Sequence, residues 1–201
     1  MEKTLAVTRP RTKPAEVRRE ELMDAAERLF LEKGVGNTSV DEIVAAADVA
    51  KGTFYVHFAS KEHLMAALQQ RFVTSFADLI QVAMDRRPAD DWRGRLRAWA
   101  TAGVNGYLDR VALHDVVFHE IHIPDRRLKH ENVVVARLAT FLERGTQAEA
   151  WSVVEPHLTA VMLFNALHGA VDDALGAGSP VNRKRLARTL AEFCERAVAA
   201  A

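Results

Sequence analysis

Apolar residues recur three and four positions apart along most of the 201-residue chain, which is the spacing of one face of an α-helix. The first such face comprises Leu22, Ala25, Ala26, Leu29 and Phe30. No segment alternates apolar with polar residues as a half-buried strand does, and ten glycines and six prolines leave little turn chemistry for a sheet of many strands. The sequence therefore predicts an all-α protein of about nine helices.

Composition excludes several classes of protein. Apolar residues make up 49% of the chain and charged residues 27%, as in ordinary soluble globular proteins. No apolar run approaches the ~18 residues of a membrane span, and the N-terminus lacks the apolar core of a secretory signal. The single cysteine, Cys194, excludes an intrachain disulfide framework and a cysteine-based zinc finger, and we expect it to be a small buried hydrophobe. We expect a cytoplasmic protein without a membrane partner.

Glycine, proline and capping residues indicate where the helices begin and end. Gly34 is expected to end the first helix, because glycine accepts the left-handed conformation of a C-terminal cap. Ser39 and Glu42 have the spacing of a capping box, and Ser60 is placed to cap the next long helix. Later boundaries are predicted from Gly145, Gly176 and Gly178 and from Pro156 and Pro180 with their caps Glu155 and Ser179. The predicted helices cover residues 16–33, a short segment after Ser39, 51–57, 61–84, 91–109, 111–121, 126–144, 156–175 and 181–199.

The formal net charge of zero conceals a basic N-terminal arm, predicted over residues 1–15. The first nineteen residues hold six basic side chains and two acidic ones. The arm is polar, contains prolines and shows no periodicity, which predicts a flexible segment. It can bind a polyanion, with Arg9 and Arg11 placed to enter a minor groove of DNA, or it can serve only as a solubilising tail.

Residues 16–63 have the pattern of a helix-turn-helix: two short helices joined by a tight turn and held by a longer preceding helix. Phe54 and Phe58, four residues apart on the second short helix, should face the core. Other side chains of this helix suit base edges and close approach in the major groove, namely Lys51, Gly52 and Thr53. The second short helix is therefore the predicted recognition helix.

A further set of polar side chains can contact phosphates and fix the register on DNA, namely Tyr55, His57 and Lys61. The helix starts at Ser39 and Lys61 also present free N–H groups that suit phosphate oxygens. Each has a plainer alternative: Tyr55 can pack across the turn, His57 can be a neutral surface ring and Lys61 a solvated charge. Thr38 and Ser39 can act only as helix caps.

The spacing of these residues extends over three helices. It reads Thr38-Ser39-Val40-x-x-Ile43-Val44-x-x-Ala47-x-Val49-x-x-Gly52-Thr53-Phe54-Tyr55-x-His57-Phe58-x-x-Lys61-x-x-Leu64, preceded by Ala25-Ala26-x-x-Leu29-Phe30-x-x-x-Gly34. Residues 17–64 thereby resemble the DNA-binding signature of the TetR family. The resemblance implies an all-helical homodimer that binds a palindromic operator and is released by a small-molecule ligand held in its C-terminal domain.

The same resemblance assigns roles to matching positions. It implies phosphate contacts for Thr38 and Ser39, base contacts for Lys51, Gly52 and Thr53, and backbone contacts for Tyr55, His57 and Lys61. The chain departs from the family pattern at three places: Asp48 stands where glycine is usual, Ala50 where serine is frequent, and Val56 where an aromatic residue is frequent. Aspartate visits the left-handed region better than most residues, so the turn at Asp48 should form.

Residues 64–201 are predicted to form a helical ligand-binding and dimerisation domain. Helices near 156–175 and 181–199 would pair with those of a second copy in a four-helix interface, the alternative being ordinary intrachain packing. Aromatic and histidine residues between positions 99 and 168 are candidates for a ligand pocket, the alternative being plain core. They are Trp99, Tyr107, Phe118, His119, His122, Phe164 and His168.

A histidine and carboxylate cluster over residues 114–122 raises a second kind of function, a metal-dependent enzyme. His119 and His122 share a helix face, but His114 lies ~140° from His119, and the spacing is not the H-E-x-x-H of zinc proteases. The sequence has no nucleophile elbow, P-loop or dinucleotide motif. We therefore expect a regulator without enzymatic activity, cofactor or metal. A repressor released by its ligand is favoured, and an activator or a co-repressor-dependent regulator stays open.

Overall fold

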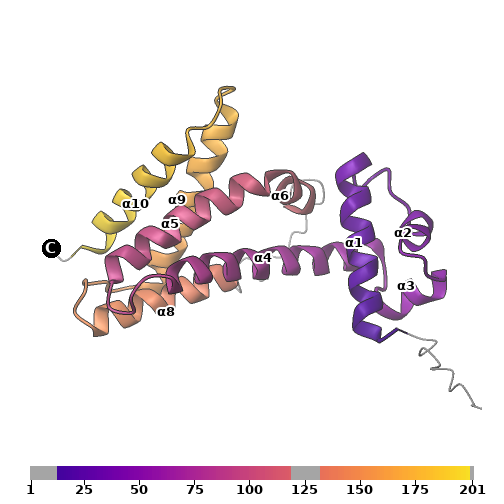
Figure 1. Ribbon diagram of the computed structural model, residues 1–201, viewed down its shortest axis with the longest axis horizontal. Helices are drawn as coiled ribbons and strands as arrows, with labels where there is room; N and C mark the ends of the chain where they lie inside the picture. The colour runs from indigo at the N-terminus through magenta and orange to yellow at the C-terminus, as the bar shows by residue number, and fades with distance from the viewer. Residues whose placement is uncertain (1–12, 119–131, 200–201) are drawn as a thin grey trace, which may run out of the picture. The chain divides into compact units, whose positions relative to one another are not determined.

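The computed structural model describes residues 13–118 and 132–199, and every regular element in these ranges is an α-helix (Figure 1). Nine helices are described there, which confirms the predicted all-α class. The chain divides into two compact units, residues 1–68 and residues 69–201, whereas the sequence suggested a boundary after residue 63. Among the described residues, no helix combines the length and apolar character needed to cross a membrane.

The N-terminal unit contains α1 (Ala15–Lys33), α2 (Val40–Ala46), α3 (Lys51–His57) and the first turns of α4 (Lys61–Asp85). Side chains from all four helices meet in one core. Its most buried members, each at most 1% exposed, include Leu22, Ala26, Phe30, Ile43, Phe54, Phe58 and Leu64. The predicted inward orientation of Phe54 and Phe58 is confirmed, so the opposite side of α3 faces outward. The predicted arm falls almost entirely on residues 1–12, outside the described residues.

Capping residues set the boundaries of the short helices. The capping box predicted at α2 is present: the Ser39 hydroxyl accepts from the Glu42 amide, and the Glu42 carboxylate accepts from the Ser39 amide. The backbone of Gly34 has φ +83° and ψ 158°, so the positive φ is confirmed but the residue is extended rather than left-handed helical. Asp48 has φ +52°, as expected for a residue that replaces glycine in the turn.

The C-terminal unit contains the rest of α4 with α5 (Trp92–Asp109), α6 (Val111–Phe118), α8 (Val133–Gln147), α9 (Pro156–Gly176) and α10 (Arg183–Val198). Helix α5 packs along α10 and α8 along α9, and α9 also contacts α5 and α10. Gly103 lets α5 approach α9, because a Cβ there would lie 2.2 Å from a Leu167 methyl carbon. Cys194 is fully buried in this core as predicted, and burial raises the pKa of its thiol to about 12.

Three predicted boundaries in this unit are wrong. Helix α8 begins at Val133 and not at 126, because Asn132 before it has an extended backbone and caps the helix with its side chain. Helix α8 does not end before Gly145 but continues to Gln147, and Gly145 instead makes room for the Trp151 indole, whose Nε1 donates to the Leu142 carbonyl at 2.8 Å. Helix α10 begins at Arg183 rather than 181, because the side chain of Asn182, and not Ser179, caps it. The predicted residues 119–121 and 126–131 of two helices lie outside the described residues.

Candidate nucleic-acid interface and ligand site

Helix α3 presents its polar side chains around one outward face. Tyr55 is 54% exposed, and its ring packs edge-on against Phe54 at 5.3 Å between centroids. The body of the tyrosine is thereby held by the core while its surface remains open to a partner. Thr53 and His57 are partly buried, and Lys51 and Gly52 are exposed. The five predicted recognition and phosphate-contact residues of α3 therefore all have at least part of their surface accessible.

Lys51 is held in place by an acidic neighbour. Its Nζ lies 2.7 Å from Asp41 Oδ1, and both side chains are more than half exposed. The hydrogen bond to Asp41 is the main cause that raises the pKa of Lys51, so the ammonium keeps its charge. Since Asp41 belongs to α2, the pair connects the two short helices across their solvent side, and DNA would compete with Asp41 for the ammonium.

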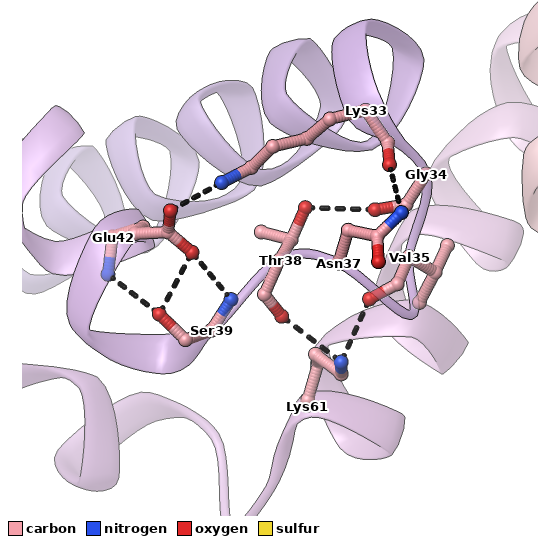
Figure 2. A network of polar contacts seen from close by, with 8 residues as sticks. All are labelled: Lys33, Gly34, Val35, Asn37, Thr38, Ser39, Glu42 and Lys61. Atoms are coloured by element: carbon pink, nitrogen blue, oxygen red, sulfur yellow. Dashed lines mark hydrogen bonds and ion pairs between the residues drawn. The ribbon is translucent and has the colours of Figure 1, made fainter.

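The turn between α1 and α2 is tied together by a network of polar contacts (Figure 2). Thr38 is 1% exposed and its hydroxyl donates to the Gly34 carbonyl at 2.8 Å. The Lys61 ammonium donates to the carbonyls of Val35 at 2.7 Å and Thr38 at 3.0 Å. The structure thus corrects the prediction for Thr38, whose side chain lies inside the turn and is not available to a phosphate. Lys61 is partly buried and primarily positions this turn.

The start of α2 carries a negative charge rather than an open anion site. The Ser39 hydroxyl donates to Glu42 Oε2 at 2.8 Å, and the Ser39 amide donates to the same oxygen at 2.8 Å. The hydrogen bond from Lys33, with those from Ser39, lowers the pKa of Glu42 to about 2. Both proton donors of Ser39 are therefore used by a carboxylate, and a phosphate could engage them only after the capping box opened.

In the C-terminal unit, a buried tyrosine links three helices. The Tyr107 hydroxyl of α5 donates to Asp172 Oδ1 of α9 at 2.6 Å, and its oxygen lies 3.1 Å from Nδ1 of His114 on α6. Because the single tyrosine proton goes to Asp172, a protonated Nδ1 of His114 is the donor to Tyr107. Burial and the Asp172 carboxylate raise the pKa of Tyr107 well above its usual range, so the phenol stays protonated.

Aromatic rings surround this tyrosine. His168 lies 5.1 Å from Tyr107 and 4.3 Å from Phe164 between ring centroids, and Phe118 lies 5.0 Å from His114. The backbone carbonyl of Phe164 accepts from Nδ1 of His168 at 3.0 Å. Burial lowers the pKa of His168, which favours the neutral ring at neutral pH. Tyr107, Asp172 and His114 thus form a small hydrogen-bonded group that aromatic rings surround.

The structure brings together four of the seven predicted ligand residues, namely Tyr107, Phe118, Phe164 and His168. Trp99 belongs elsewhere: it is 2% exposed and borders a hollow beside Ile80 and Met84 with room for little more than a water molecule. His119 and His122 lie outside the described residues. Asp172 was missed, although it stands one helical turn after His168.

Residues 119–122 of the histidine and carboxylate cluster lie outside the described residues. Within residues 13–118 and 132–199, no group of three or more histidine, cysteine or acidic side chains could hold a metal ion. Helices α9 and α10 each leave large apolar side chains exposed: Leu158 is 48% and Met162 59% exposed on α9, and Phe193 is 45% exposed on α10. A Cβ on Gly169 would meet nothing within 4 Å, so this part of the α9 surface is open to a close neighbour.

An exposed recognition helix held on a three-helix core defines a helix-turn-helix DNA-binding protein. Residues 22–68 match the family model described as bacterial regulatory proteins of the tetR family. Residues 22–68 are thus similar to the DNA-binding part of this family of bacterial transcriptional regulators.

Curated relatives match over less than half of this chain. The transcriptional activator FasR of Mycolicibacterium smegmatis is 38% identical over 85 residues, 42% of this chain and 38% of its own. The transcriptional repressor DhaR of Mycobacterium sp. strain GP1 is 43% identical over 61 residues, 30% of this chain and 29% of its own. The regulator EthR of Mycobacterium tuberculosis is 30% identical over 96 residues, 48% of this chain and 43% of its own. The matches thus span less than half the length of each relative.

Solved structures match over nearly the whole chain. A putative tetR family regulator from Shewanella sp. PV-4 has a TM-score of 0.71 at 18% identity and covers 92% of this chain and 99% of its own. A tetR family regulator from Rhodococcus RHA1 has a TM-score of 0.68 at 22% identity and covers 94% of this chain and 100% of its own. At these identities the likeness shows the fold, and the ligand and operator are separate questions.

Proposed function

We propose that this chain is a homodimeric regulator that binds a palindromic operator, and that a small organic ligand in its C-terminal unit releases it. The observation that carries the proposal is the outward face of α3, where Lys51 and Tyr55 stand exposed on a helix anchored by the buried Phe54. A helix of this size fits the major groove. Thr53 and Lys51 are proposed to contact base edges, and Tyr55 and His57 phosphates.

The dimer is proposed to form through α9 and α10. Their exposed apolar side chains, Leu158, Met162 and Phe193, gain most by meeting a second copy, since such a surface in water costs free energy. Gly169 would let the two copies of α9 approach closely. A single helix-turn-helix binds weakly, whereas a dimer can read two half-sites about 34–36 Å apart.

The ligand site is proposed at Tyr107 and the rings around it. The aromatic wall of Phe118, Phe164 and His168 suits a flat apolar molecule, and the hydrogen bond between Tyr107 and Asp172 offers a place for one hydroxyl group. Helix α4 provides the covalent connection to the DNA-binding unit, because residues 61–68 belong to one unit and 69–85 to the other. The ligand and DNA would then select different conformations of one dimer.

DNA recognition is tested by selection from a randomised duplex library, followed by affinity measurement on the selected duplex. Lys51→Ala should weaken binding about tenfold or more, because it removes a base or phosphate contact, and Tyr55→Phe should weaken it severalfold. Arg93→Ala, which removes an exposed basic side chain on α5, is the matched control and should bind as wild type. A selected duplex that Lys51→Ala and Tyr55→Phe bind as tightly as wild type would refute this assignment.

Ligand response is tested with 1-naphthol, an aromatic molecule with one hydroxyl, titrated by calorimetry with and without the selected duplex. For a repressor released by its ligand, the duplex should weaken 1-naphthol binding by the same factor as 1-naphthol weakens duplex binding. Mutual strengthening would instead indicate a regulator that needs its ligand to bind DNA. The names of the relatives include both an activator, FasR, and a repressor, DhaR. This measurement therefore decides whether the ligand weakens or strengthens DNA binding.

A further inference from the structure

One apolar side chain stands at the outermost point of α3. Successive residues of an α-helix are ~100° apart, so Gly52 and Val56, two positions on either side of the buried Phe54, both point away from the core. Val56 is 79% exposed, and a Cβ on Gly52 would meet nothing within 4 Å. Tyr55 and Thr53 flank this line on opposite sides. The outermost side chain of α3 is therefore a valine, and the hydrogen-bonding side chains of Thr53 and Tyr55 lie on either side of it.

The fold of the N-terminal unit does not require a valine at position 56. At 79% exposure its methyl groups contribute little to the core, and valine forms helices less readily than alanine. Isolated exposed apolar residues are common on protein surfaces. The position of this one, at the tip of the helix proposed to enter the groove, is what suggests a partner.

The major groove of DNA offers a valine one suitable group. Base edges there present hydrogen-bond donors and acceptors, and the exception is the C5-methyl group of thymine. A valine that covered a phosphate or a base nitrogen would displace water without replacing its hydrogen bond. Beside Val56, the bare backbone at Gly52 lets the helix come close enough for methyl groups to touch.

We propose that Val56 is a specificity-determining residue that selects a thymine in each operator half-site through its C5-methyl group. The proposal rests on the operator binding proposed above and assigns one base of the half-site that polar contacts would not specify. The polar residues beside it then fix the register, while the valine distinguishes thymine from the other bases at that step.

The test replaces thymines of the selected duplex one at a time by uracil, which removes only the C5-methyl group. At one thymine in each half-site, wild type should lose about fourfold in affinity, as expected for the loss of one buried methyl group. Val56→Ala should lose a similar factor on the thymine duplex and nothing more on the uracil duplex. Val154→Ala, which changes a 91% exposed valine of the C-terminal unit, is the matched control and should keep the uracil effect.

The outcomes separate this proposal from the one on which it rests. Wild type that tolerates uracil at every thymine, or Val56→Ala that keeps the full uracil effect, would overturn the role of Val56 while leaving operator binding intact. A chain that selects no duplex at all would overturn both. Circular dichroism of Val56→Ala should match wild type, because the substituted side chain lies outside the core.

Discussion

At the scale of single residues, the pair of Asp41 and Lys51 combines opposite effects on DNA binding. Asp41 holds the lysine ammonium in position, yet places a carboxylate, itself 68% exposed, beside a surface proposed to meet phosphates. Exposed ion pairs contribute little to stability, so the carboxylate is not needed to hold α2 and α3 together. We therefore expect Asp41 to lower the electrostatic, sequence-independent part of the affinity for DNA.

Asp41→Asn should therefore strengthen DNA binding, by about three- to tenfold at low salt, because Lys51 becomes available to a phosphate. The slope of log affinity against log salt should steepen by about one phosphate contact, or ~0.9. Fluorescence anisotropy over a series of salt concentrations measures both the affinity for DNA and its salt slope. Asp78→Asn, which breaks an exposed pair with Arg137 in the C-terminal unit, should leave the slope unchanged. A weaker Asp41→Asn complex would mean that the aspartate orients Lys51 for a base.

At the scale of elements, α2 and α8 end in the same way. After α2, the Val49 amide donates to the Val44 carbonyl at 3.0 Å and the Asp48 amide to Ala45 at 3.2 Å. After α8, the Ala150 amide donates to Gly145 at 2.9 Å and the Glu149 amide to Thr146 at 3.1 Å. These are the two bonds of a Schellman motif, with Asp48 at φ +52° and Glu149 at φ +57° where glycine is usual.

Replacing either residue by glycine should stabilise the unit that contains it. The left-handed conformation costs a residue with a Cβ about 1 kcal/mol, and glycine avoids that cost. Asp48→Gly should gain less than Glu149→Gly, because aspartate tolerates the conformation better. Urea denaturation followed by circular dichroism measures both, with Asp48→Ala as a control that should lose stability. A loss of stability in both glycine variants would show that contacts of the acidic side chains outweigh the strain.

These motifs also show why the sequence predicted helices well and some of their ends badly. Apolar spacing reports which residues a helix buries, so the recognition helix at 51–57 was predicted with its observed bounds. A glycine was expected to end α8, but Gly145 makes room for the ring of Trp151, which lies beyond the end of the helix, while Glu149 makes the turn. Thr38 was misjudged for a similar reason. Its hydroxyl is used by a carbonyl four residues earlier, and spacing alone does not show which side of a turn faces inward.

The candidate ligand site shows the same limit of prediction from local sequence patterns. The aromatic residues of α5, α6 and α9 could be nominated from the sequence, because they recur on predicted helices. That Tyr107 joins Asp172 from 65 residues away, and that Trp99 belongs to a different part of the core, depends on how the helices pack. Local patterns carry no information on such contacts between elements distant in sequence.

At the scale of the whole molecule, the exposed apolar surface of α9 and α10 bears on every function proposed for the chain. A ligand-controlled dimer needs this surface to be covered, because only a pair of recognition helices can be spaced or misspaced against two half-sites. Met162 and Phe193 lie on different helices of the same unit and are the most exposed large apolar residues on each. They are therefore the positions where an added charge would oppose a second copy at least cost to the monomer.

The double variant Met162→Glu with Phe193→Glu should be monomeric in analytical ultracentrifugation, since two copies would bury four unpaired carboxylates. Its circular dichroism should stay that of the wild type, because both side chains are about half exposed. Affinity for the selected palindromic duplex should fall by about 100-fold or more, as a monomer loses the second half-site. Val82→Glu, which places a charge on a 53% exposed valine of α4, should remain dimeric and bind normally. A wild type that sediments as one subunit at all concentrations would contradict the dimer role proposed for the apolar face of α9 and α10. It would also contradict the proposal that a ligand acts by changing the spacing of two recognition helices.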